Sequence, residues 1–308
     1  MMNKIVAIQG NHPSKLNPVT DTSVFLAHEI QNKKYKIFYY DPKDLSVINS
    51  KVIAKGFFIE FNYSKKKFFK ILKKQKLDLS RCKFILIRQD PPFNLEYISA
   101  TYILDTIKNK VNIINNPTSI RNVSEKLYSV KYQKYMPSTI FTQNIDEIKK
   151  FFKKNKKVIL KPIHSFSGNN IHLLNKFNLK LVQKFIRQHD HIMCQKYLPK
   201  ISKGDKRVFL INGKVCGAIS RVPKKGSFLS NMSKGAKPIN IKLTKTENKI
   251  SKLVARDLKK ENIYFAGIDF IDQKLNGDIN VTSPTGLKTL FDLSGINLAK
   301  TFWHELKA

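Results

Sequence analysis

The sequence predicts an α/β fold (α+β overall), in which a parallel sheet comes first and antiparallel strands follow. Short apolar runs alternate with helical patterns over the first third of the chain, as they do in parallel sheets. Later, the Asn-Gly pairs at 212–213 and 276–277 separate strand-like runs, a strong signal for antiparallel hairpins. The chain has 308 residues, of which 42% are hydrophobic, so we expect two or three domains with a large core.

The first third of the chain carries the predicted parallel sheet. Short runs of Ile, Val, Phe and Leu predict strands at 5–8, 37–40, 84–87 and 111–115. Asp21 is expected to cap a helix that carries Val24 and Ile30, and a second helix is expected at 98–107. Segment 52–61 is interpreted as an outer hairpin.

Arg88 and Asp90 directly follow the predicted strand 84–87. Ligands of parallel sheets bind at the carboxyl ends of the strands, so both residues are candidates for a binding site. The alternative is a capped loop with a local ion pair.

The middle of the chain begins with a boundary at Asn116-Pro117 and a predicted helix at 119–127 that contains Lys126. A strand, a helix and a further strand at 158–162 are expected after Pro137. Lys161 lies inside that apolar strand, where a lysine is rarely buried without a partner. Phosphate is one such partner, and an edge lysine that reaches the solvent is the alternative.

Small polar residues at 164–170 follow Lys161 and lead into a predicted strand at 171–174. Two strands joined in this way can fold over a triphosphate. Further strands are predicted at 192–199 and from 203 to the turn at Asn212-Gly213, with a returning strand that reaches Arg221.

Asp278 and Asn280 are two residues apart in a predicted strand, so their side chains point to the same side. A turn at 273–277 would place Asp269 of the preceding strand beside them, and these hard oxygen donors suit Mg²⁺ on a bound phosphate. Residues 283–286 (Ser-Pro-Thr-Gly) then offer backbone amides and hydroxyls to an anion. The alternative is an edge hairpin with solvated polar residues.

The net charge of +35 raises the possibility of a nucleic-acid-binding protein. The lysines are spread along the whole chain, however, and the Lys-rich runs at 65–74 and 149–154 are interpreted as amphipathic helices with solvated lysines. We therefore favour an ordinary lysine-rich surface, whose positive field would also attract an anion such as ATP.

No apolar run is long enough for a membrane span, and the N-terminus does not resemble a signal peptide. Cys82, Cys194 and Cys216 are far apart and odd in number, so we interpret them as reduced thiols and expect a cytoplasmic protein.

Taken in order, several segments resemble the bacterial glutathione synthetases, which are ATP-grasp ligases. The similar segments run nearly from end to end: RQDPPF at 88–93, ATYIL at 100–104, NPTSIRNVSEKL at 116–127, ILKP at 159–162, QKYLP at 195–199, GDKRV at 204–208, SRVP at 220–223, GIDFI at 267–271 and INVTSPTG at 279–286. Each segment alone is a weak signal, but their order and spacing are specific.

The resemblance implies an N-terminal Rossmann-like substrate domain at 1–120, a small ATP-grasp lid subdomain at 121–200 and a C-terminal ATP-grasp catalytic subdomain at 201–308. ATP would be clamped between two antiparallel sheets. The implied enzyme joins γ-glutamylcysteine to glycine through an acyl phosphate, and the resemblance also implies a homotetramer.

The resemblance implies site residues as well. ATP would contact Lys126, Lys161, Gly168, Gln195, Tyr197, Leu198, Asp205 and Arg207, while Asp269, Asp278 and Asn280 would hold Mg²⁺, with Mn²⁺ as the alternative ion. The peptide and glycine would contact Arg88, Asp90, Arg221, Asn231, Ser283, Pro284, Thr285 and Gly286, with Arg207 and Arg221 as the catalytic residues.

Three features depart from the pattern of the family. The loop after Lys161-Pro162 has a single glycine, Leu229 stands where an arginine is expected, and Asp278 stands where glutamate is usual. These departures keep open a second interpretation, an ATP-grasp ligase that joins a different acid or amine. A basic nucleic-acid-binding protein without catalysis is the third.

Overall fold

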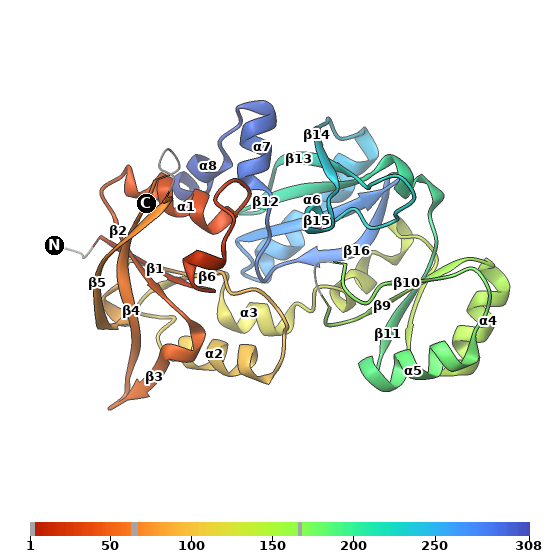
Figure 1. Ribbon diagram of the computed structural model, residues 1–308, viewed down its shortest axis with the longest axis horizontal. Helices are drawn as coiled ribbons and strands as arrows, with labels where there is room; N and C mark the ends of the chain where they lie inside the picture. The colour runs from red at the N-terminus through yellow and green to blue at the C-terminus, as the bar shows by residue number, and fades with distance from the viewer. Residues whose placement is uncertain (1–3, 63–66, 166–167) are drawn as a thin grey trace.

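The computed structural model describes residues 4–62, 67–165 and 168–308, and their strands form three separate sheets (Figure 1). The sheets follow one another along the chain. The mixed α/β class predicted from the sequence is confirmed.

The N-terminal sheet has seven strands in the order β3-β4-β2-β1-β6-β7, with β5 paired to β4. Strands β1, β2, β6 and β7 are parallel, as the sequence predicts, and the other three are antiparallel. The bounds are β1 (Ile5–Gln9), β2 (Lys36–Tyr40), β3 (Leu45–Ile48), β4 (Lys51–Phe61), β5 (Phe69–Asp78), β6 (Phe84–Ile87) and β7 (Asn112–Ile114).

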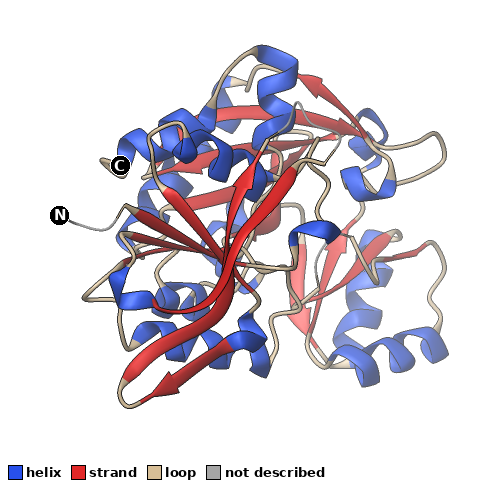
Figure 2. Ribbon diagram, turned by 60° about the vertical axis from the view of Figure 1, so that its left-hand side comes forward, coloured by secondary structure: helices blue, strands red, loops and turns tan. Residues whose placement is uncertain are grey.

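Helices cover both faces of this sheet (Figure 2). They are α1 (Thr22–Gln31), α2 (Leu95–Asp105) and α3 (Pro117–Asn122). Alternate residues of β1 face opposite ways: Val6 and Ile8 belong to the cluster that includes α1, whereas Ala7 belongs to the cluster that includes α2. The predicted cap is also confirmed, because the carboxylate of Asp21 accepts a hydrogen bond from the backbone nitrogen of Val24 at 2.8 Å.

The second sheet has four antiparallel strands in the order β10-β9-β11-β8. Its strands and helices are β8 (Thr139–Thr142), α4 (Ile145–Asn155), β9 (Val158–Pro162), β10 (His172–Leu174), α5 (Leu179–His189) and β11 (Ile192–Lys196). Both helices pack on one face through Ile148, Phe151, Val182 and Phe185. The opposite face of this sheet therefore remains available to line a site.

The third sheet has five antiparallel strands in the order β14-β13-β12-β15-β16. The elements of this part are β12 (Asp205–Ile211), β13 (Lys214–Val222), β14 (Lys237–Asn240), α6 (Lys245–Lys260), β15 (Phe265–Ile271), β16 (Lys274–Asn280), α7 (Leu287–Ser294) and α8 (Leu298–Glu305). Helices α7 and α8 lie beside α1 in Figure 1, and the indole nitrogen of Trp303 donates to the carbonyl of Leu26 at 2.9 Å. The C-terminal helices thus share one core with the N-terminal sheet.

Two interpretations of the N-terminal third are wrong. The Lys-rich run at 65–74 is not a helix: residues 69–74 belong to strand β5, and residues 63–66 lie outside the described part. Its apolar residues Phe69 and Ile71 alternate with lysines and pair with β4, so the period is that of a strand. Segment 52–61 is one long strand rather than a hairpin, and the turn before it lies at Asn49-Ser50, both with positive φ. The second Lys-rich run, 149–154, does form a helix, α4.

Two boundaries also differ from those expected. Helix α3 ends at Asn122, so Lys126 follows the helix and precedes a 3₁₀ segment at Leu127–Tyr135. The turn between β15 and β16 lies at Asp272-Gln273, with φ of 49° and 62°, and not at 273–277. Asn276 and Gly277 lie inside β16, where the register of the pair shifts.

No helix in the described ranges is long and apolar enough to cross a membrane.

Candidate active site

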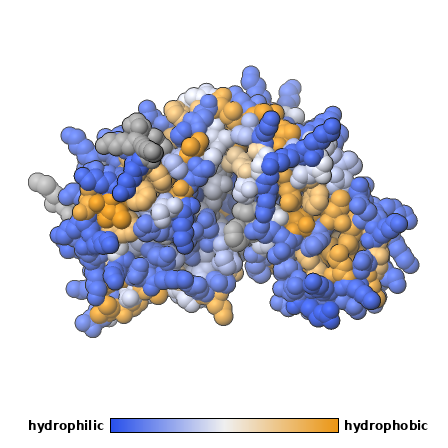
Figure 3. Space-filling view, viewed as in Figure 1, coloured by the Kyte–Doolittle hydropathy of each residue, from blue (hydrophilic) through white to orange (hydrophobic). Residues whose placement is uncertain are grey.

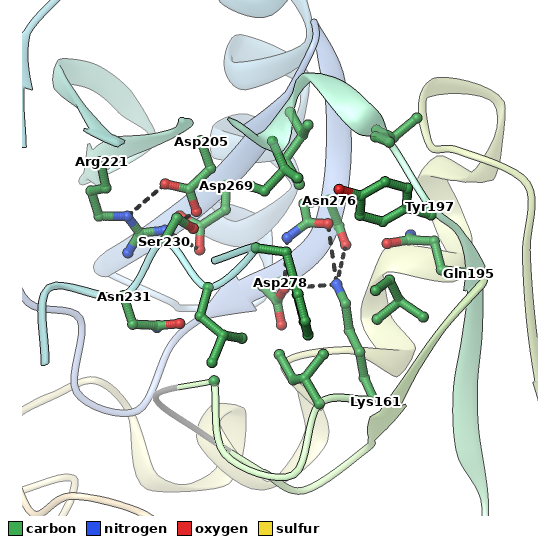
Figure 4. Close-up of a pocket in the computed structure, with 18 of the residues that line it drawn as sticks. Lys161, Gln195, Tyr197, Asp205, Arg221, Ser230, Asn231, Asp269, Asn276 and Asp278 are labelled. Carbon is green, nitrogen blue, oxygen red and sulfur yellow. Dashed lines mark hydrogen bonds and ion pairs between the residues drawn. The ribbon is translucent and has the colours of Figure 1, made fainter. Parts of the chain in front are cut away.

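A pocket lies between the inner faces of the two antiparallel sheets (Figure 4). Strand β9 shows how the sequence builds it: Val158 and Leu160 pack against α4 and α5, whereas Ile159 and Lys161 point the other way, into the pocket. Strand β16 alternates in the same manner, with Leu275 and Ile279 in the core and the polar residues between them in the pocket.

Most of the site residues predicted from the sequence meet in this pocket. They are Lys126, Lys161, Gly168, Gln195, Tyr197, Leu198, Asp205, Arg207, Arg221, Asn231, Asp269, Asp278 and Asn280.

Lys161 and Lys126 converge on Asp278 in the pocket. The ammonium nitrogen of Lys161 lies 3.3 Å from Asp278 Oδ2, and that of Lys126 lies 3.5 Å from Asp278 Oδ1. Lys161 is only 4% exposed and β9 lies between β10 and β11, so it is not an edge lysine that reaches the solvent. Lys126 also donates to the carbonyl of Ser165 at 2.8 Å. The two lysines carry one more positive charge than Asp278 neutralises, and the surplus suits a phosphate.

The ionisation of Asp278 follows from these contacts. Burial alone would raise the pKa of its carboxyl, but the charges of Lys161 and Lys126 outweigh burial and hold the pKa below its usual value. Asp278 is therefore a carboxylate at neutral pH.

Two arginines and two aspartates form a buried network on β12, β13 and β15. Arg207 stands directly opposite Asp269, and Asp205 directly opposite Arg221, in the strand registers. Arg207 forms a two-point contact with Asp269, in which Nη2 donates to Oδ2 at 2.8 Å. Arg221 donates from Nε to Asp205 Oδ1 at 2.8 Å, and its Nη2 lies 3.0 Å from Asp269 Oδ2. Arg221 thereby bridges both carboxylates.

The two carboxyls respond differently to this network. Burial raises the pKa of Asp269, but Arg207 and Arg221 together reverse the effect and lower it to about 2. For Asp205 burial dominates over the charge of Arg221, so its pKa lies above the usual value.

One end of the pocket is mainly apolar. Ile159, Leu198, Ile201 and Ile271 line it together with the predicted Gln195 and Tyr197. The side-chain nitrogen of Gln195 donates to the hydroxyl of Thr139 at 2.9 Å. The three isoleucines were not predicted from the sequence as pocket residues. Ile159 could have been found, because it shares a strand face with Lys161. A pocket wall with several apolar side chains and a few polar ones accommodates an aromatic base.

Residues 228–231 close another side of the pocket, and Leu229 is among its lining residues. Gly168 faces this segment with φ of +71°, and a Cβ there would lie 2.4 Å from Asn231 Oδ1. The positive φ and the close approach of Asn231 favour glycine at this point of the loop after Lys161. The remaining loop residues 166 and 167 lie outside the described residues.

The other six predicted residues do not line this pocket, and most of them gather at the carboxyl ends of β1 and β6. Arg88 Nη2 donates to the carbonyl of Pro284 at 3.0 Å, and Ser283 Oγ donates to the carbonyl of Arg88 at 3.3 Å. The backbone nitrogen of Gly286 donates to Thr22 Oγ1 at 3.1 Å. Thr285 is exposed between Pro284 and Gly286.

Asp90 forms no hydrogen bond or close ion pair with Arg88 and instead accepts from Asn11 Nδ2 at 3.0 Å. Arg88 is buried, and burial lowers the pKa of its guanidinium although Asp21 and Asp90 act in the opposite direction. The local Arg88–Asp90 ion pair that sequence analysis offered as an alternative is thus not formed as a direct contact.

Glu125 connects this second group to the pocket, and sequence analysis did not identify it. Its Oε1 accepts from the backbone nitrogens of Val281 and Thr282 at 2.9 and 3.1 Å, and from Thr282 Oγ1 at 2.8 Å. Because Lys126 is the next residue, the segment that carries this lysine is tied to the start of the 283–286 loop. In the sequence, Glu125 is a carboxylate beside a lysine within the predicted helix 119–127, and this pattern gave no signal of such a role.

The pocket offers oxygen donors of the kind that Mg²⁺ prefers. Asp269, Asp278 and Asn280 all line it, and the side-chain nitrogen of Asn280 donates to the carbonyl of Gly267 at 3.1 Å. The described residues hold no cluster of three or more His, Cys, Asp or Glu that could form a complete metal cage. Mg²⁺ commonly takes one or two carboxylates and completes its shell with phosphate and water, so the donors fit an ion that arrives with a nucleotide.

Comparisons with known proteins agree with this geometry. Residues 5–121 match the family model "Prokaryotic glutathione synthetase, N-terminal domain", and residues 125–295 match "Prokaryotic glutathione synthetase, ATP-grasp domain". The chain belongs to the prokaryotic glutathione synthetase family.

Relatives in this family span nearly the whole chain. The glutathione synthetase of Agrobacterium fabrum is 33% identical over 315 residues, which cover 99% of this chain and 96% of the relative. That of Buchnera aphidicola subsp. Baizongia pistaciae is 36% identical over 301 residues, which cover 96% and 93%.

Solved structures show the same ATP-grasp fold at lower identity. The ATP-grasp ligase PsnB, in complex with a precursor variant, Mg and ADP, has a TM-score of 0.66 and 12% identity, with 99% of this chain and 98% of that chain covered. D-alanyl-alanine synthetase A from Vibrio cholerae has a TM-score of 0.63 and 13% identity, with both chains fully covered. At these identities the likeness concerns the fold alone.

Proposed function

We propose that this family member is an ATP-dependent ligase that joins γ-glutamylcysteine to glycine and releases glutathione, ADP and phosphate. The observation that carries the proposal is the convergence of Lys126, Lys161 and Arg207 in one pocket between two antiparallel sheets. The two glutathione synthetase family models together match most of the chain and support the same substrates.

ATP would lie with its base at the apolar end and its phosphates at the lysines. Gln195, Tyr197 and Leu198 would edge the adenine, and Asp205 would contact the nucleotide. Lys126 and Lys161 would neutralise charge on the phosphates, and Arg207 would approach the transferred phosphoryl group. Such groups accelerate phosphoryl transfer by positioning and by charge stabilisation rather than by covalent chemistry.

Asp269, Asp278 and Asn280 would hold a divalent ion on the phosphates, and we propose Mg²⁺, with Mn²⁺ as the alternative. When bound, the ion supplies positive charge to the phosphate oxygens. Asp278 is already ionised by its two lysines, as a metal ligand must be.

The acid and the amine would lie between the pocket and the second group of residues. Arg88, Asp90, Asn231 and the 283–286 loop would hold the peptide and glycine, with Arg221 directed at a substrate carboxylate. The cysteinyl carboxylate attacks the γ-phosphorus, the bond to the β-phosphate oxygen breaks, and an acyl phosphate forms with ADP. The amine of glycine then attacks the acyl carbon and loses a proton, and the tetrahedral intermediate expels phosphate.

A product assay tests this function. The purified protein is incubated with ATP, Mg²⁺, γ-glutamylcysteine and glycine, and the products are identified by mass spectrometry. We expect glutathione, ADP and phosphate in equal amounts, with each organic substrate required. ADP formation that is independent of both amino substrates would contradict the proposal.

Leu229 favours a second candidate, a ligase with a different acid or amine. It lines the pocket where the family pattern has an arginine, so one charged contact to a substrate is missing. Phosphate release measured across a panel of acids and amino acids separates the two candidates. A kcat/KM that is higher for γ-glutamylcysteine and glycine than for any other pair is expected for glutathione synthesis. A higher kcat/KM for another pair supports the second candidate.

We do not propose a nucleic-acid partner, in spite of the charge of +35. Hydrophilic residues lie over both halves of the face seen in Figure 3, as expected for lysines spread along the whole chain. Binding to duplex DNA that falls steeply with salt would support the opposite view.

We further propose residues 1–120 as the substrate domain, 121–200 as the lid and 201–308 as the catalytic part, in a cytoplasmic homotetramer. The three cysteines form no disulfide, in keeping with a reducing compartment. Sedimentation equilibrium at several protein concentrations tests the oligomer, and a mass of one or two chains would contradict it.

A further inference from the structure

Asn276 lies at an irregularity in the β15–β16 pair. Ile268 pairs with Ile279 and Phe270 pairs with Leu275, so Asp269 alone stands opposite the three residues Asn276, Gly277 and Asp278. Gly277 adopts φ of +83°, and a Cβ there would lie 2.5 Å from the Cε of Met193. The positive φ favours glycine at this bulge, and the residues on either side of it, Asn276 and Asp278, both line the pocket.

The side chain of Asn276 connects the lysine and the carboxylate of the phosphate site (Figure 4). Lys161 Nζ donates to Asn276 Oδ1 at 3.1 Å and to the backbone carbonyl of Asn276 at 3.1 Å. The amide nitrogen of Asn276 donates to Asp278 Oδ2 at 3.1 Å. Both ends of the amide are therefore used, one toward the cation and one toward the anion.

The neutrality of Asn276 determines the charge of the site. The charges of Lys126, Lys161 and Asp278 sum to +1. Asn276 supplies two hydrogen-bond acceptors to Lys161 without neutralising its positive charge. A carboxylate at the same position would complete the neutralisation of both lysines before any ligand arrives. Asp278 Oδ2 accepts from both the Asn276 amide, at 3.1 Å, and Lys161 Nζ, at 3.3 Å. Lys161 therefore shares this oxygen with the amide.

We infer that Asn276 is a positioning residue that presents the ammonium of Lys161, still positively charged, to the phosphates of the nucleotide. The inference rests on the proposed ATP site and adds a residue to it. Its effect is specific to the phosphate end, because the contacts of Asn276 reach Lys161 and Asp278 and not the apolar end of the pocket.

Two substitutions test the inference through binding alone. Asn276→Asp adds a negative charge 3.1 Å from Lys161 and should raise the Kd of a non-hydrolysable ATP analogue at least about tenfold. Asn276→Ala removes the side-chain amide that contacts Lys161 and Asp278 without adding charge, and it should raise this Kd about threefold. Gln273→Glu is the matched control, since it makes the same amide-to-carboxylate change at the exposed turn of the same hairpin, and it should leave the Kd unchanged.

Adenosine separates positioning from a general structural role. We expect calorimetric titration to give the same adenosine Kd for the wild-type protein and all three variants, because adenosine carries no phosphate. Equal weakening of adenosine and of the ATP analogue would overturn the inference, as would unchanged binding of the analogue by Asn276→Asp. Failure of the wild-type protein to bind the analogue would instead overturn the proposed ATP site itself.

Discussion

Arg207 of β12 stands directly opposite Asp269 of β15, and its Nη2 donates to Asp269 Oδ2 at 2.8 Å deep inside the protein. An ion pair at this depth stabilises the fold only while the carboxyl is ionised, so the pair makes stability depend on pH. It also holds Arg207 in place on the pocket wall.

We predict a specific pH dependence for the variant Arg207→Met. The pKa of Asp269 is about 2 in the folded protein against an ordinary 3.8, so its contribution is present above about pH 4 and is lost as the pH falls toward 2. This shift corresponds to about 2 kcal/mol. Removing Arg207 should therefore lower the free energy of unfolding at pH 7, and the difference from the wild-type protein should narrow between about pH 4 and pH 2. Urea unfolding at several pH values measures this, and a constant difference would count against it.

We predict that Lys161→Ala strongly weakens nucleotide binding while the fold persists. The substitution removes the ammonium that contacts Asn276 and Asp278 in the pocket. Affinity for an ATP analogue should fall at least about tenfold, since a charged contact to phosphate is lost. Circular dichroism checks the fold.

Lys200→Ala is the control for this prediction. Lys200 pairs with Asp272 at 2.6 Å on the exposed surface, where such pairs contribute little. The Lys200→Ala variant should bind the ATP analogue with wild-type affinity. Wild-type affinity in Lys161→Ala would show that β9 does not form the phosphate site.

We predict that Asp278→Asn raises the Mg²⁺ concentration needed for activity and lowers turnover at least about tenfold. The change removes a full negative charge from a proposed dication site. Asp272→Asn should have neither effect, because Asp272 lies in the exposed turn between β15 and β16. Mg²⁺ titrations of activity compare the two, and equal damage would mean that the proposed ligand set is wrong.

We predict that segment 228–237 moves when ligands bind and shields the acyl phosphate from water. Its residues 228–231 line the pocket, and small and polar residues such as Gly226, Ser233 and Gly235 surround them. Limited proteolysis should cut this segment more slowly once ATP and γ-glutamylcysteine are present. The same cutting rate with and without ligands would argue against a lid.

The sequence predicted the fold well where a pattern had one physical meaning. Asp21 before an apolar helix was expected to be a cap, and Lys161 within an apolar strand suggested a partner in the interior. The parallel strands of the first sheet were equally clear, because short buried runs alternated with helices.

Errors arose where one pattern suited two structures. The lysines and apolar residues of 65–74 fit a helix as well as a strand, and pairing with β4 decided between them. Asn276-Gly277 has the composition of a turn but lies at a bulge inside β16, because the chain already turns at Asp272-Gln273. Glu125 could not be found at all, since its partners, two backbone nitrogens and the hydroxyl of Thr282, lie about 156 residues away in the chain.

An isotope experiment tests the central claim, ligation through an acyl phosphate, most directly. γ-Glutamylcysteine labelled with ¹⁸O in its cysteinyl carboxylate is incubated with the protein, ATP, Mg²⁺ and glycine, and the phosphate and peptide are analysed by mass spectrometry. Attack of the carboxylate on the γ-phosphorus and later cleavage of the carbon–oxygen bond transfer one ¹⁸O to each phosphate released, and the account predicts this transfer together with glutathione. Glutathione formed with unlabelled phosphate, or labelled phosphate without a peptide product, would contradict it.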